Sequence, residues 1–199
     1  FSGLSFFGGM ILSIALLVWY ARKNKIGILH LMDAGTPALA IGYGFGRLGC
    51  QVSGDGDWGI PNDNPMPDWL SFLPDWMWAY NYPNNVLGVD MVEYFADKGY
   101  TSLTGYAYPT PVYEIIMSIF IFAFLWSMRK KWTIPGTMLS VYFVLSGIER
   151  LLIEQIRINN EYDILGGITQ AEIISVCTIL VGALGVYYTP KYGKRWAKW

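Results

Sequence analysis

The stretch from Gly46 to Gly59, GRLGCQVSGDGDWG, concentrates groups that could bind an anion. It holds Arg47 in a backbone with little side-chain bulk, and two carboxylates, Asp55 and Asp57, follow closely. A long apolar run ends at Arg47, which places its charge where a buried segment would end. A cation there is costly unless it meets a counter-charge or an anionic ligand. The stretch therefore predicts an anion site.

A second charged segment lies in GIERLLIEQIR, residues 147–157. On a helix, Arg150, Glu154 and Arg157 are related by four, three and seven positions, so they would share one face. Burying a lone charge near the middle of a bilayer costs about 2.5–3.5 kcal/mol. We therefore expect these charges to pair around a polar cavity. The alternative is an exposed helix end with ordinary salt bridges.

Two further apolar runs open with polar residues that could face the same cavity. PTPVYE at 109–114 contains Tyr113 and Glu114, and Thr169 and Gln170 lie at the start of the last run.

Two other sequence patterns do not predict the sites that they resemble. Residues 44–49 fit the dinucleotide pattern G-x-G-x-x-G, but no strand precedes them. Asp55-Gly56-Asp57 resembles the start of a calcium loop, but no Gly stands at position six of that loop and no Glu at position twelve, so we expect no metal site.

The composition predicts a helical membrane protein. Of 199 residues, 53% are hydrophobic and 15% are charged, against roughly 25% charged in a typical soluble domain. Nine Trp and fourteen Tyr suit a membrane–water interface, where aromatic rings gather. A net charge of −1 gives no basic field that would bind nucleic acid. The two cysteines, Cys50 and Cys177, provide no disulfide framework.

Four apolar stretches approach the ~20 residues that a membrane-spanning helix needs; they are residues 4–20, 112–128, 135–153 and 168–188. A fifth, residues 28–48, is less uniform. Thr36 and Pro37 there resemble an N-cap and a first helical residue, so we expect this crossing to be broken near Asp33–Thr36. The predicted fold is an all-α polytopic membrane protein with about five transmembrane segments, in a single membrane domain over residues 1–199.

Basic residues give the expected orientation. Lys and Arg cluster at 22–25, 129–131 and 191–195, each after an apolar run, and such clusters face the cytoplasm. Residues 51–108 then form an extracytoplasmic loop or cap, and the predicted anion site faces outward, where phospholipid headgroups are the commonest anions. The loop repeats Pro-Asp-Trp at 67–69 and 74–76. It either lies on the outer leaflet or forms a compact cap that buries its own aromatic rings.

Several of these segments resemble the prolipoprotein diacylglyceryl transferase family. Residues 46–59 are similar to the family pattern G-R-x-G-N-F-x-N-G-E-x-x-G, with Cys50 and Ser53 at the asparagine positions and Asp55 at the glutamate position. One residue is inserted before Trp58. The other similar segments pair 109–114 with H-P-T/S-x-L-Y-E, 147–157 with G-x-x-R-x-x-x-E-x-x-R, 169–170 with M/T-Q, and 5–9 with S-F-H-G-G.

The resemblance implies transfer of the diacylglyceryl group from phosphatidylglycerol to the lipobox cysteine thiol of preprolipoproteins, at the outer face of the bacterial cytoplasmic (inner) membrane. It implies that Arg47 and Arg150 clamp the phosphate. The full set of expected catalytic residues is Arg47, Arg150, Asp55 and Glu154. The expected substrate-binding residues are Gly46, Gly49, Cys50, Ser53, Tyr113, Glu114, Arg157 and Gln170. No cofactor is expected, because the two reactants carry everything that is consumed.

The chain also departs from the family pattern. Phe7 stands where the family has the histidine of S-F-H-G-G, and a phenyl ring cannot accept a proton. The alternative acceptors for the thiol proton are Asp55, Glu149, Glu154 and Tyr113. We interpret Cys50 as a small polar substitute for asparagine rather than as a nucleophile, and we expect the family's additional N-terminal helices to be absent. Two other functions stay open: a lipid-binding or transport protein, and an inactive relative that is a scaffold in a membrane complex.

Overall fold

The computed structural model describes residues 6–158, 161–162 and 168–196. Its long helices are α1 (Phe6–Lys23), α2 (Ile28–Ser53), α4 (Thr110–Met128), α5 (Thr137–Glu154) and α6 (Gln170–Trp196). Between α2 and α4 lie two short 3-10 helices, η1 (Asp68–Leu70) and η2 (Asp75–Met77), and α3 (Met91–Asp97). Two short strands, β1 (Glu161–Tyr162) and β2 (Ile168–Thr169), pair antiparallel before α6.

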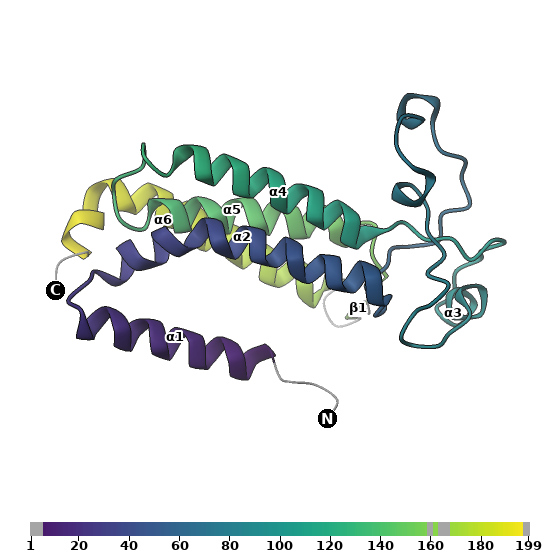
Figure 1. Cartoon of the computed structure of the whole chain (residues 1–199), viewed down its shortest axis with the longest axis horizontal. Coiled ribbons are helices and arrows are strands. Elements are labelled where there is room, and N and C mark those ends of the chain that lie inside the picture. The colour runs from purple at the N-terminus through teal and green to yellow at the C-terminus, as the bar shows by residue number, and fades with distance from the viewer. Residues whose placement is uncertain (1–5, 159–160, 163–167, 197–199) are drawn as a thin grey trace.

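Four of the helices form a bundle. Figure 1 shows α2, α4, α5 and α6 side by side, with α1 next to α2 and the α2–α4 loop projecting from one end, which we call the loop end. The turn between α1 and α2, the turn between α4 and α5, and the last residues of α6 lie at the opposite end. The three basic clusters of the sequence therefore lie together at that opposite end, as the orientation hypothesis requires.

The surface of the bundle is strongly apolar. Large hydrophobic side chains are exposed along several helices, including Ile11 of α1, Phe120 of α4 and Leu180 of α6. Water-soluble monomers rarely expose contiguous apolar patches of this extent. By length and composition, α4 and residues 170–192 of α6 could each cross a membrane, with a mean hydropathy of 1.7 in both. The predicted helices are confirmed as helices, whereas five membrane crossings stay a prediction.

The predicted break in the second crossing is wrong, because α2 continues through residues 33–37. The Thr36 hydroxyl does not cap a new helix but donates back to the Met32 carbonyl, 2.8 Å away, within the same helix. Pro37 has no N–H and so removes one helical hydrogen bond. Together these two features bend a helix without ending it. A bend in the first part of α2 is visible in Figure 1.

The bend places Asp33 against the start of α5. Its carboxylate accepts hydrogen bonds from the backbone N–H groups of Gly136, at 2.7 Å, and Leu139, at 2.9 Å. These are among the N–H groups that a helix N-terminus leaves without intrahelical partners. A negative charge there is also favoured by the helix dipole. Asp33 therefore caps α5 from another helix and fixes the relative position of α2 and α5.

Small residues let α5 and α6 pack closely. A Cβ atom on Gly182 would lie 2.7 Å from the Ser140 carbonyl oxygen and 2.8 Å from the Val144 nitrogen. A Cβ atom on Gly147 would lie 2.6 Å from Cγ1 of Ile179. Only glycine permits this separation, which is typical of helix packing in membranes. The close contact holds the charged end of α5 against the start of α6.

We expect Gly182→Ala to destabilise the protein by about 1–3 kcal/mol, because the added methyl group meets backbone atoms that cannot move aside. Gly42→Ala in α2 is the matched control, since no atom lies within 4 Å of its added Cβ. The measurement is the thermal unfolding midpoint of each variant in detergent. Equal midpoints for the two variants would show that the α5–α6 contact is not this close.

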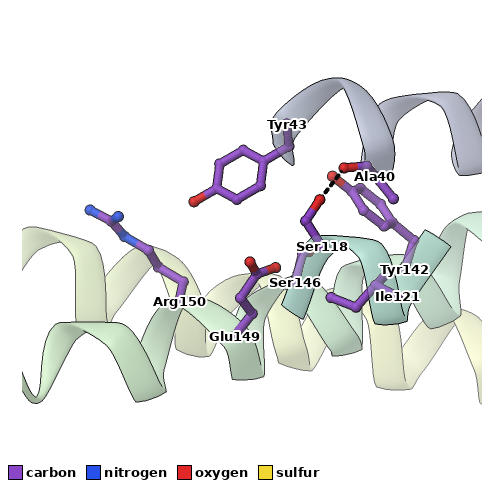
Figure 2. Close-up of a pocket in the computed structure, with 8 residues that line it drawn as sticks. All are labelled: Ala40, Tyr43, Ser118, Ile121, Tyr142, Ser146, Glu149 and Arg150. Atoms are coloured by element: carbon purple, nitrogen blue, oxygen red, sulfur yellow. Dashed lines mark hydrogen bonds between the residues drawn. The ribbon is translucent and has the colours of Figure 1, made fainter. Parts of the chain in front are cut away.

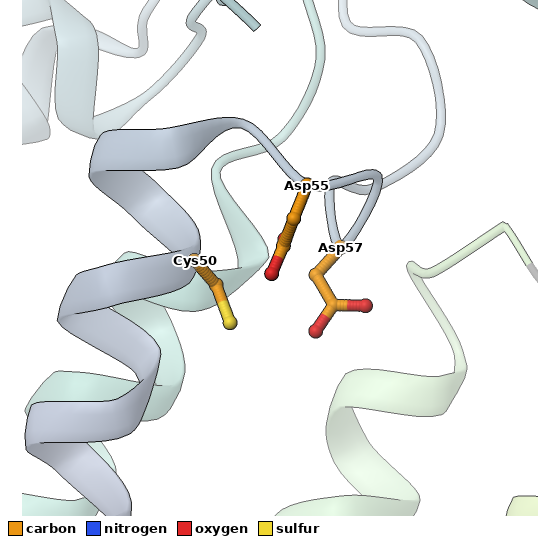
Figure 3. A group of neighbouring side chains, drawn as sticks. All are labelled: Cys50, Asp55 and Asp57. Atoms are coloured by element: carbon orange, nitrogen blue, oxygen red, sulfur yellow. The ribbon is translucent and has the colours of Figure 1, made fainter. Parts of the chain in front are cut away.

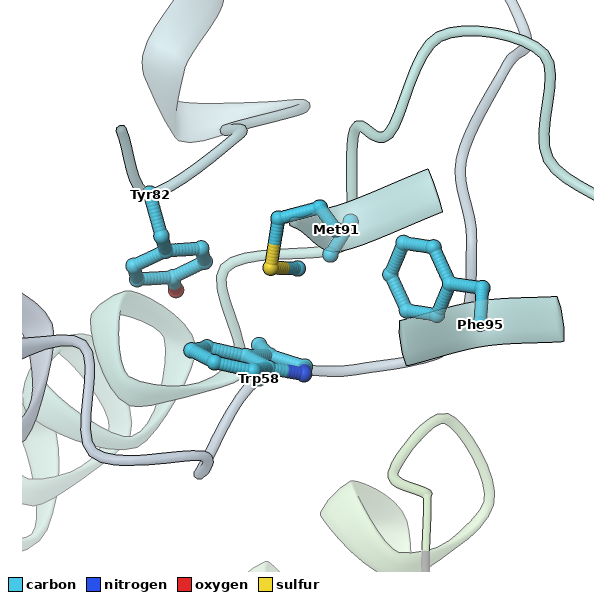
Figure 4. Close-up of a cluster of buried hydrophobic side chains, with 5 residues drawn as sticks. Trp58, Tyr82, Met91 and Phe95 are labelled. Carbon is cyan, nitrogen blue, oxygen red and sulfur yellow. The ribbon is translucent and has the colours of Figure 1, made fainter. Parts of the chain in front are cut away.

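The loop has a hydrophobic core of its own. Trp58 is 1% exposed and packs with Tyr82, Met91 and Phe95 (Figure 4). The Trp58 and Tyr82 rings lie 5.1 Å apart between centroids. The part around η1 behaves differently, because Trp69 is 74% exposed. Each sequence hypothesis for the loop thus fits one part of it: a compact cap around Trp58, and exposed aromatic rings around η1.

Candidate active site

Glu114 is the centre of a charged network at the loop end of the bundle. It lies in the second turn of α4, and its side chain has no exposed surface. Its carboxylate accepts a hydrogen bond from the Tyr43 hydroxyl at 2.6 Å. It also pairs with Arg47 Nε at 3.3 Å and with Arg150 Nη1 at 3.5 Å. One buried carboxylate therefore joins α2, α4 and α5 and balances two arginines.

Asp57 makes the second junction of the network. One of its carboxylate oxygens pairs with Arg47, and the other pairs with Arg157. Arg47 thus has two acidic partners, Asp57 at the loop and Glu114 in the bundle. Because an arginine has five N–H donors, it can hold both carboxylates and still bind another group.

The backbone around Gly59 places Asp57 at this point. Gly59 forms a β-bridge with Arg157, and the Ile60 N–H donates to the Ile156 carbonyl at 2.9 Å. A Cβ atom on Gly59 would lie only 2.6 Å from that carbonyl oxygen. The chain therefore needs glycine at this position to pass the end of α5. The Thr110 hydroxyl further holds the segment by donating to the Asp57 carbonyl at 2.5 Å.

The structure corrects the expected position of Arg157. The helical-face argument placed it on α5 with Arg150 and Glu154, but α5 ends at Glu154 and a turn follows. Arg157 reaches the network from the β-bridge and not from the helix. Burial, and repulsion from Arg47, lower the pKa of Arg157. Asp57 supplies the counter-charge that stabilises this largely buried guanidinium.

Glu154 connects the network to β2, directly before α6. Its carboxylate pairs with Arg150 Nη2 at 3.7 Å and accepts a hydrogen bond from the Thr169 hydroxyl at 2.5 Å. The Glu154 side chain is 1% exposed. An ordinary surface salt bridge at an exposed helix end is therefore excluded, and the hypothesis of paired charges in the interior is confirmed.

The remaining residues of the expected site lie around the network and not in it. Cys50 Sγ is 3.8 Å from Arg47 Nη1, and the Ser53 hydroxyl donates within α2 to the Cys50 carbonyl at 3.4 Å. Asp55 is exposed. The other expected residues are Gly46, Gly49 and Gln170, which are exposed, and Tyr113, which is partly buried. Their expected roles in binding substrate stay predictions.

A group of possible metal ligands lies beside Arg47. The ligand atoms of Cys50, Asp55 and Asp57 lie within 4.8 Å of one another (Figure 3). Both Asp57 oxygens are already paired with arginines. A cation would have to displace a guanidinium and then sit close to two positive charges. The donor set therefore fits a metal poorly.

A small cavity adjoins the network between α2, α4 and α5. Its volume is about 140 Å³. Figure 2 shows Glu149, Arg150, Tyr43 and Ser118 around it. Glu149 is 6% exposed, and its Oε1 atom has no hydrogen-bond partner among the described residues. The remaining lining residues are Ala40, Ile121, Tyr142 and Ser146.

Two residues of the network were not predicted as site residues, Tyr43 and Asp57. Tyr43 precedes Arg47 by four positions, and residues so spaced on a helix are neighbours, so its position could have been predicted. The Arg47 guanidinium lies 5.0 Å from the centroid of the Tyr43 ring. Asp57 was present in the sequence motif. Asp55 was assigned to the glutamate position instead, because residues 46–55 align with the family pattern without a gap and the inserted residue comes after them.

These features define a class of protein: a helical bundle with an apolar surface that encloses an arginine–carboxylate network at one end. Residues 1–188 match the prolipoprotein diacylglyceryl transferase family, and the chain belongs to that family. The expectation based on the sequence motifs is therefore confirmed at the level of the family.

Individual relatives carry the name phosphatidylglycerol–prolipoprotein diacylglyceryl transferase. The chain is 28% identical over 228 residues to that of Leptospira interrogans, with 100% of the chain and 60% of the relative covered. It is 27% identical over 192 residues to that of Xylella fastidiosa, covering 90% of the chain and 61% of the relative. For Bordetella parapertussis the identity is 26% over 188 residues, covering 93% and 60%. The chain thus spans about 60% of the length of these relatives.

Proposed function

We propose that this protein transfers the diacylglyceryl group of phosphatidylglycerol to the cysteine thiol of prolipoproteins, the reaction that the names of its relatives describe. The observation that carries the proposal is the position of Arg47 and Arg150. They come from two separate family-like motifs and lie on either side of the same buried carboxylate, Glu114. Two guanidinium groups so placed are suited to a phosphate group between them.

In this reaction the thiolate sulfur attacks the glycerol carbon that carries the phosphate. A carbon–sulfur bond forms, the carbon–oxygen bond breaks, and glycerol phosphate leaves with the electron pair of the broken bond. The energetic problem is the charge that gathers on the leaving phosphate. N–H donors already directed at that charge stabilise the transition state. We assign this role to Arg47 and Arg150.

The acidic partners leave donors free for the phosphate. They engage Nε and Nη1 of Arg47, and Nη1 and Nη2 of Arg150. Within the described residues, Arg47 Nη2 and Arg150 Nε form no ion pair. Because Asp57, Glu114 and Glu154 balance the three arginines, we propose that the phosphate binds through these directed N–H groups and not through an excess of positive charge.

An apolar groove beside the network suits the lipid chains. It has a volume of about 680 Å³ and lies between α2, α4 and the η2 part of the loop. Leu48, Val52, Ile115 and Trp76 are among its lining residues. We propose that an acyl chain of the lipid occupies it, while the headgroup reaches Arg47 at the end of the groove. The apolar side chains that line the groove would surround a hydrocarbon chain favourably.

The proposed function also has a cellular location and a membrane orientation. We propose a multi-pass protein of the bacterial cytoplasmic membrane, with the loop end outward and residues 51–108 as an extracytoplasmic cap of one membrane domain. The grouping of the three basic clusters at the opposite end supports this orientation. The expected partners are phosphatidylglycerol and the lipobox segment of a prolipoprotein signal peptide.

The test is a reconstituted transfer reaction. Purified protein in phosphatidylglycerol vesicles is mixed with a lipobox peptide, and the expected result is a peptide whose mass increases by one diacylglyceryl group. The same peptide with serine in place of cysteine, and vesicles of phosphatidylethanolamine, should give no product. If the wild-type protein yields no lipidated peptide even in its native lipids, the proposed activity is wrong and a scaffold role is favoured.

A further inference from the structure

We propose that Glu149 accepts the proton of the acceptor thiol, and that the cavity between α2, α4 and α5 receives the thiol side chain. The inference rests on the proposed function and identifies a group that the function requires. A cysteine must lose its proton before its sulfur can attack, since only the thiolate is nucleophilic. The question is which side chain takes that proton.

Among the described residues, Glu149 has a buried acceptor oxygen, and its carboxylate forms no ion pair with the arginines, unlike those of Glu114 and Glu154. It is 6% exposed, and its Oε1 atom has no hydrogen-bond partner among the described residues. A buried polar atom without a partner is rare in native structures and calls for an explanation. In Figure 2 the carboxylate points into the space that Tyr43, Ser118 and Arg150 border. An unused acceptor directed into a cavity is what a proton acceptor needs before its substrate arrives.

The other three candidate acceptors are less suited. One Glu154 oxygen accepts from the Thr169 hydroxyl, and the other, which has no hydrogen bond, pairs with Arg150 at 3.7 Å. Asp55 is exposed at the start of the loop and does not line the cavity. Tyr113 is a neutral phenol and is not among the residues that line the cavity. Of the four acceptors that the sequence left open, Glu149 alone combines a buried free oxygen with a cavity to receive the thiol.

Among the described residues at the loop end of the bundle there is no histidine, a frequent proton acceptor in enzymes. The sequence contains one histidine, His30. It lies in the first turn of α2, at the end opposite to the loop. Within this chain, the candidates for the part of an imidazole are therefore the four acceptors named above.

The size of the cavity fits a side chain and not a lipid headgroup. Its volume is about 140 Å³, whereas pockets for drug-sized ligands occupy about 300–1,000 Å³. A cysteine side chain has only a methylene and a sulfur. Ala40 and Ile121 provide apolar wall, and Ser118 is committed through its hydroxyl to the Ala40 carbonyl. The cavity thus offers the thiol a position beside the carboxylate of Glu149.

The cavity also borders the proposed phosphate site. Arg150, the residue after Glu149 on α5, lines the same cavity. A thiolate formed there would therefore lie beside the lipid carbon whose phosphate Arg150 binds. The thiol proton moves to a Glu149 oxygen, the sulfur bonds to the glycerol carbon, and the carbon–oxygen bond breaks toward the phosphate. Glu149 then returns its proton to the departing glycerol phosphate or to water, which restores the carboxylate.

The first test is the variant Glu149→Gln, which keeps the shape of the side chain and removes the acceptor charge. In the reconstituted reaction at pH 7, its kcat/KM should fall on the order of 10²–10⁴-fold, the usual contribution of a general base. At pH 9 the loss should shrink, because the peptide thiol then ionises without help. Glu93→Gln, the same change at an exposed carboxyl of α3, is the control and should match the wild type.

The pH comparison isolates residue 149 because the groups around it are the same in both proteins. Those groups are Tyr43 and Arg47 of α2, Glu114 of α4, and Tyr142 and Arg150 of α5. The α6 residues that pack against this part of α5 include Ser175 and Ile179, which do not titrate. A second variant, Glu149→Asp, keeps a carboxylate and should retain more activity than Glu149→Gln at pH 7.

The outcomes are distinct. Wild-type activity in Glu149→Gln at pH 7 would overturn the inference and leave the proposed function intact. An equal loss at pH 7 and pH 9 would also overturn it, because it would indicate a structural role. Failure of the wild-type protein itself to form product would overturn the proposed function, and the inference with it. A loss at pH 7 that shrinks at pH 9 is the result that supports Glu149 as the proton acceptor.

Discussion

Replacing Glu114 by alanine is expected to lower the free energy of unfolding by about 3–5 kcal/mol, the cost of removing one partner from a buried ion pair. The reason is the number of groups that depend on this carboxylate. Arg47 and Arg150 would lose a shared counter-charge, and the Tyr43 hydroxyl would lose its acceptor. Because Glu114 and these partners come from three helices, α4, α2 and α5, the change should loosen the whole loop end of the bundle.

The stability measurement is thermal unfolding of the purified variants in detergent. Glu93→Ala is the control, because the Glu93 side chain is exposed on α3 and surface changes of this kind usually alter stability by less than about 0.5 kcal/mol. Glu114→Gln keeps an acceptor for the tyrosine and should cost less than Glu114→Ala. If Glu114→Ala and Glu93→Ala unfold at the same temperature, the carboxylate does not hold the helices together.

Arg47→Ala is expected to reduce the transfer rate on the order of 10²–10³-fold or more, since removing a single directed donor from a developing anion already has that effect. Arg47 lies between two acidic partners, with Asp57 at the loop and Glu114 in the bundle. Arg47→Lys should be impaired as well, because a lysine cannot reproduce the planar fork of donors. The measurement is the initial rate of lipidated peptide formation.

The control for this prediction is Arg129→Ala. Arg129 lies just after α4 at the opposite end of the bundle, over the Trp126 ring. Its loss removes a positive charge without touching the network, and the transfer rate should not change. The same experiment includes Arg150→Ala, which should resemble Arg47→Ala. Retained turnover in both network variants would refute the assignment of the phosphate to these arginines.

Much of the fold could be predicted from local patterns. Apolar runs of sufficient length gave the five long helices, and the predicted range 112–128 differs from α4 only at its start. The wrong break at Asp33–Thr36 has a local cause. Thr36-Pro37 is ambiguous, because a threonine hydroxyl can either cap a new helix or donate back within an existing one. In the structure the hydroxyl donates back, which the local sequence does not distinguish from capping.

The site was predicted in its residue types but not in its pairing. Arg47, Glu114, Arg150, Glu154 and Arg157 were expected to converge, and the structure brings them into one network. Asp57 was missed as its junction, since its contact with Arg157 joins residues 100 positions apart. A contact between residues so far apart in the sequence depends on how α5 ends and on the glycine at position 59. The periodicity of apolar and charged residues along a helix predicts neither feature.

The proposed reaction requires a phosphate group between Arg47 and Arg150. The most direct test is an experimental structure of the protein in bilayer discs that contain phosphatidylglycerol. We expect headgroup density within hydrogen-bonding distance, about 3 Å, of both guanidinium groups, with an acyl chain in the groove beside α2. A headgroup bound elsewhere in such discs, with both arginines still held only by Glu114, Asp57 and Glu154, would contradict the account.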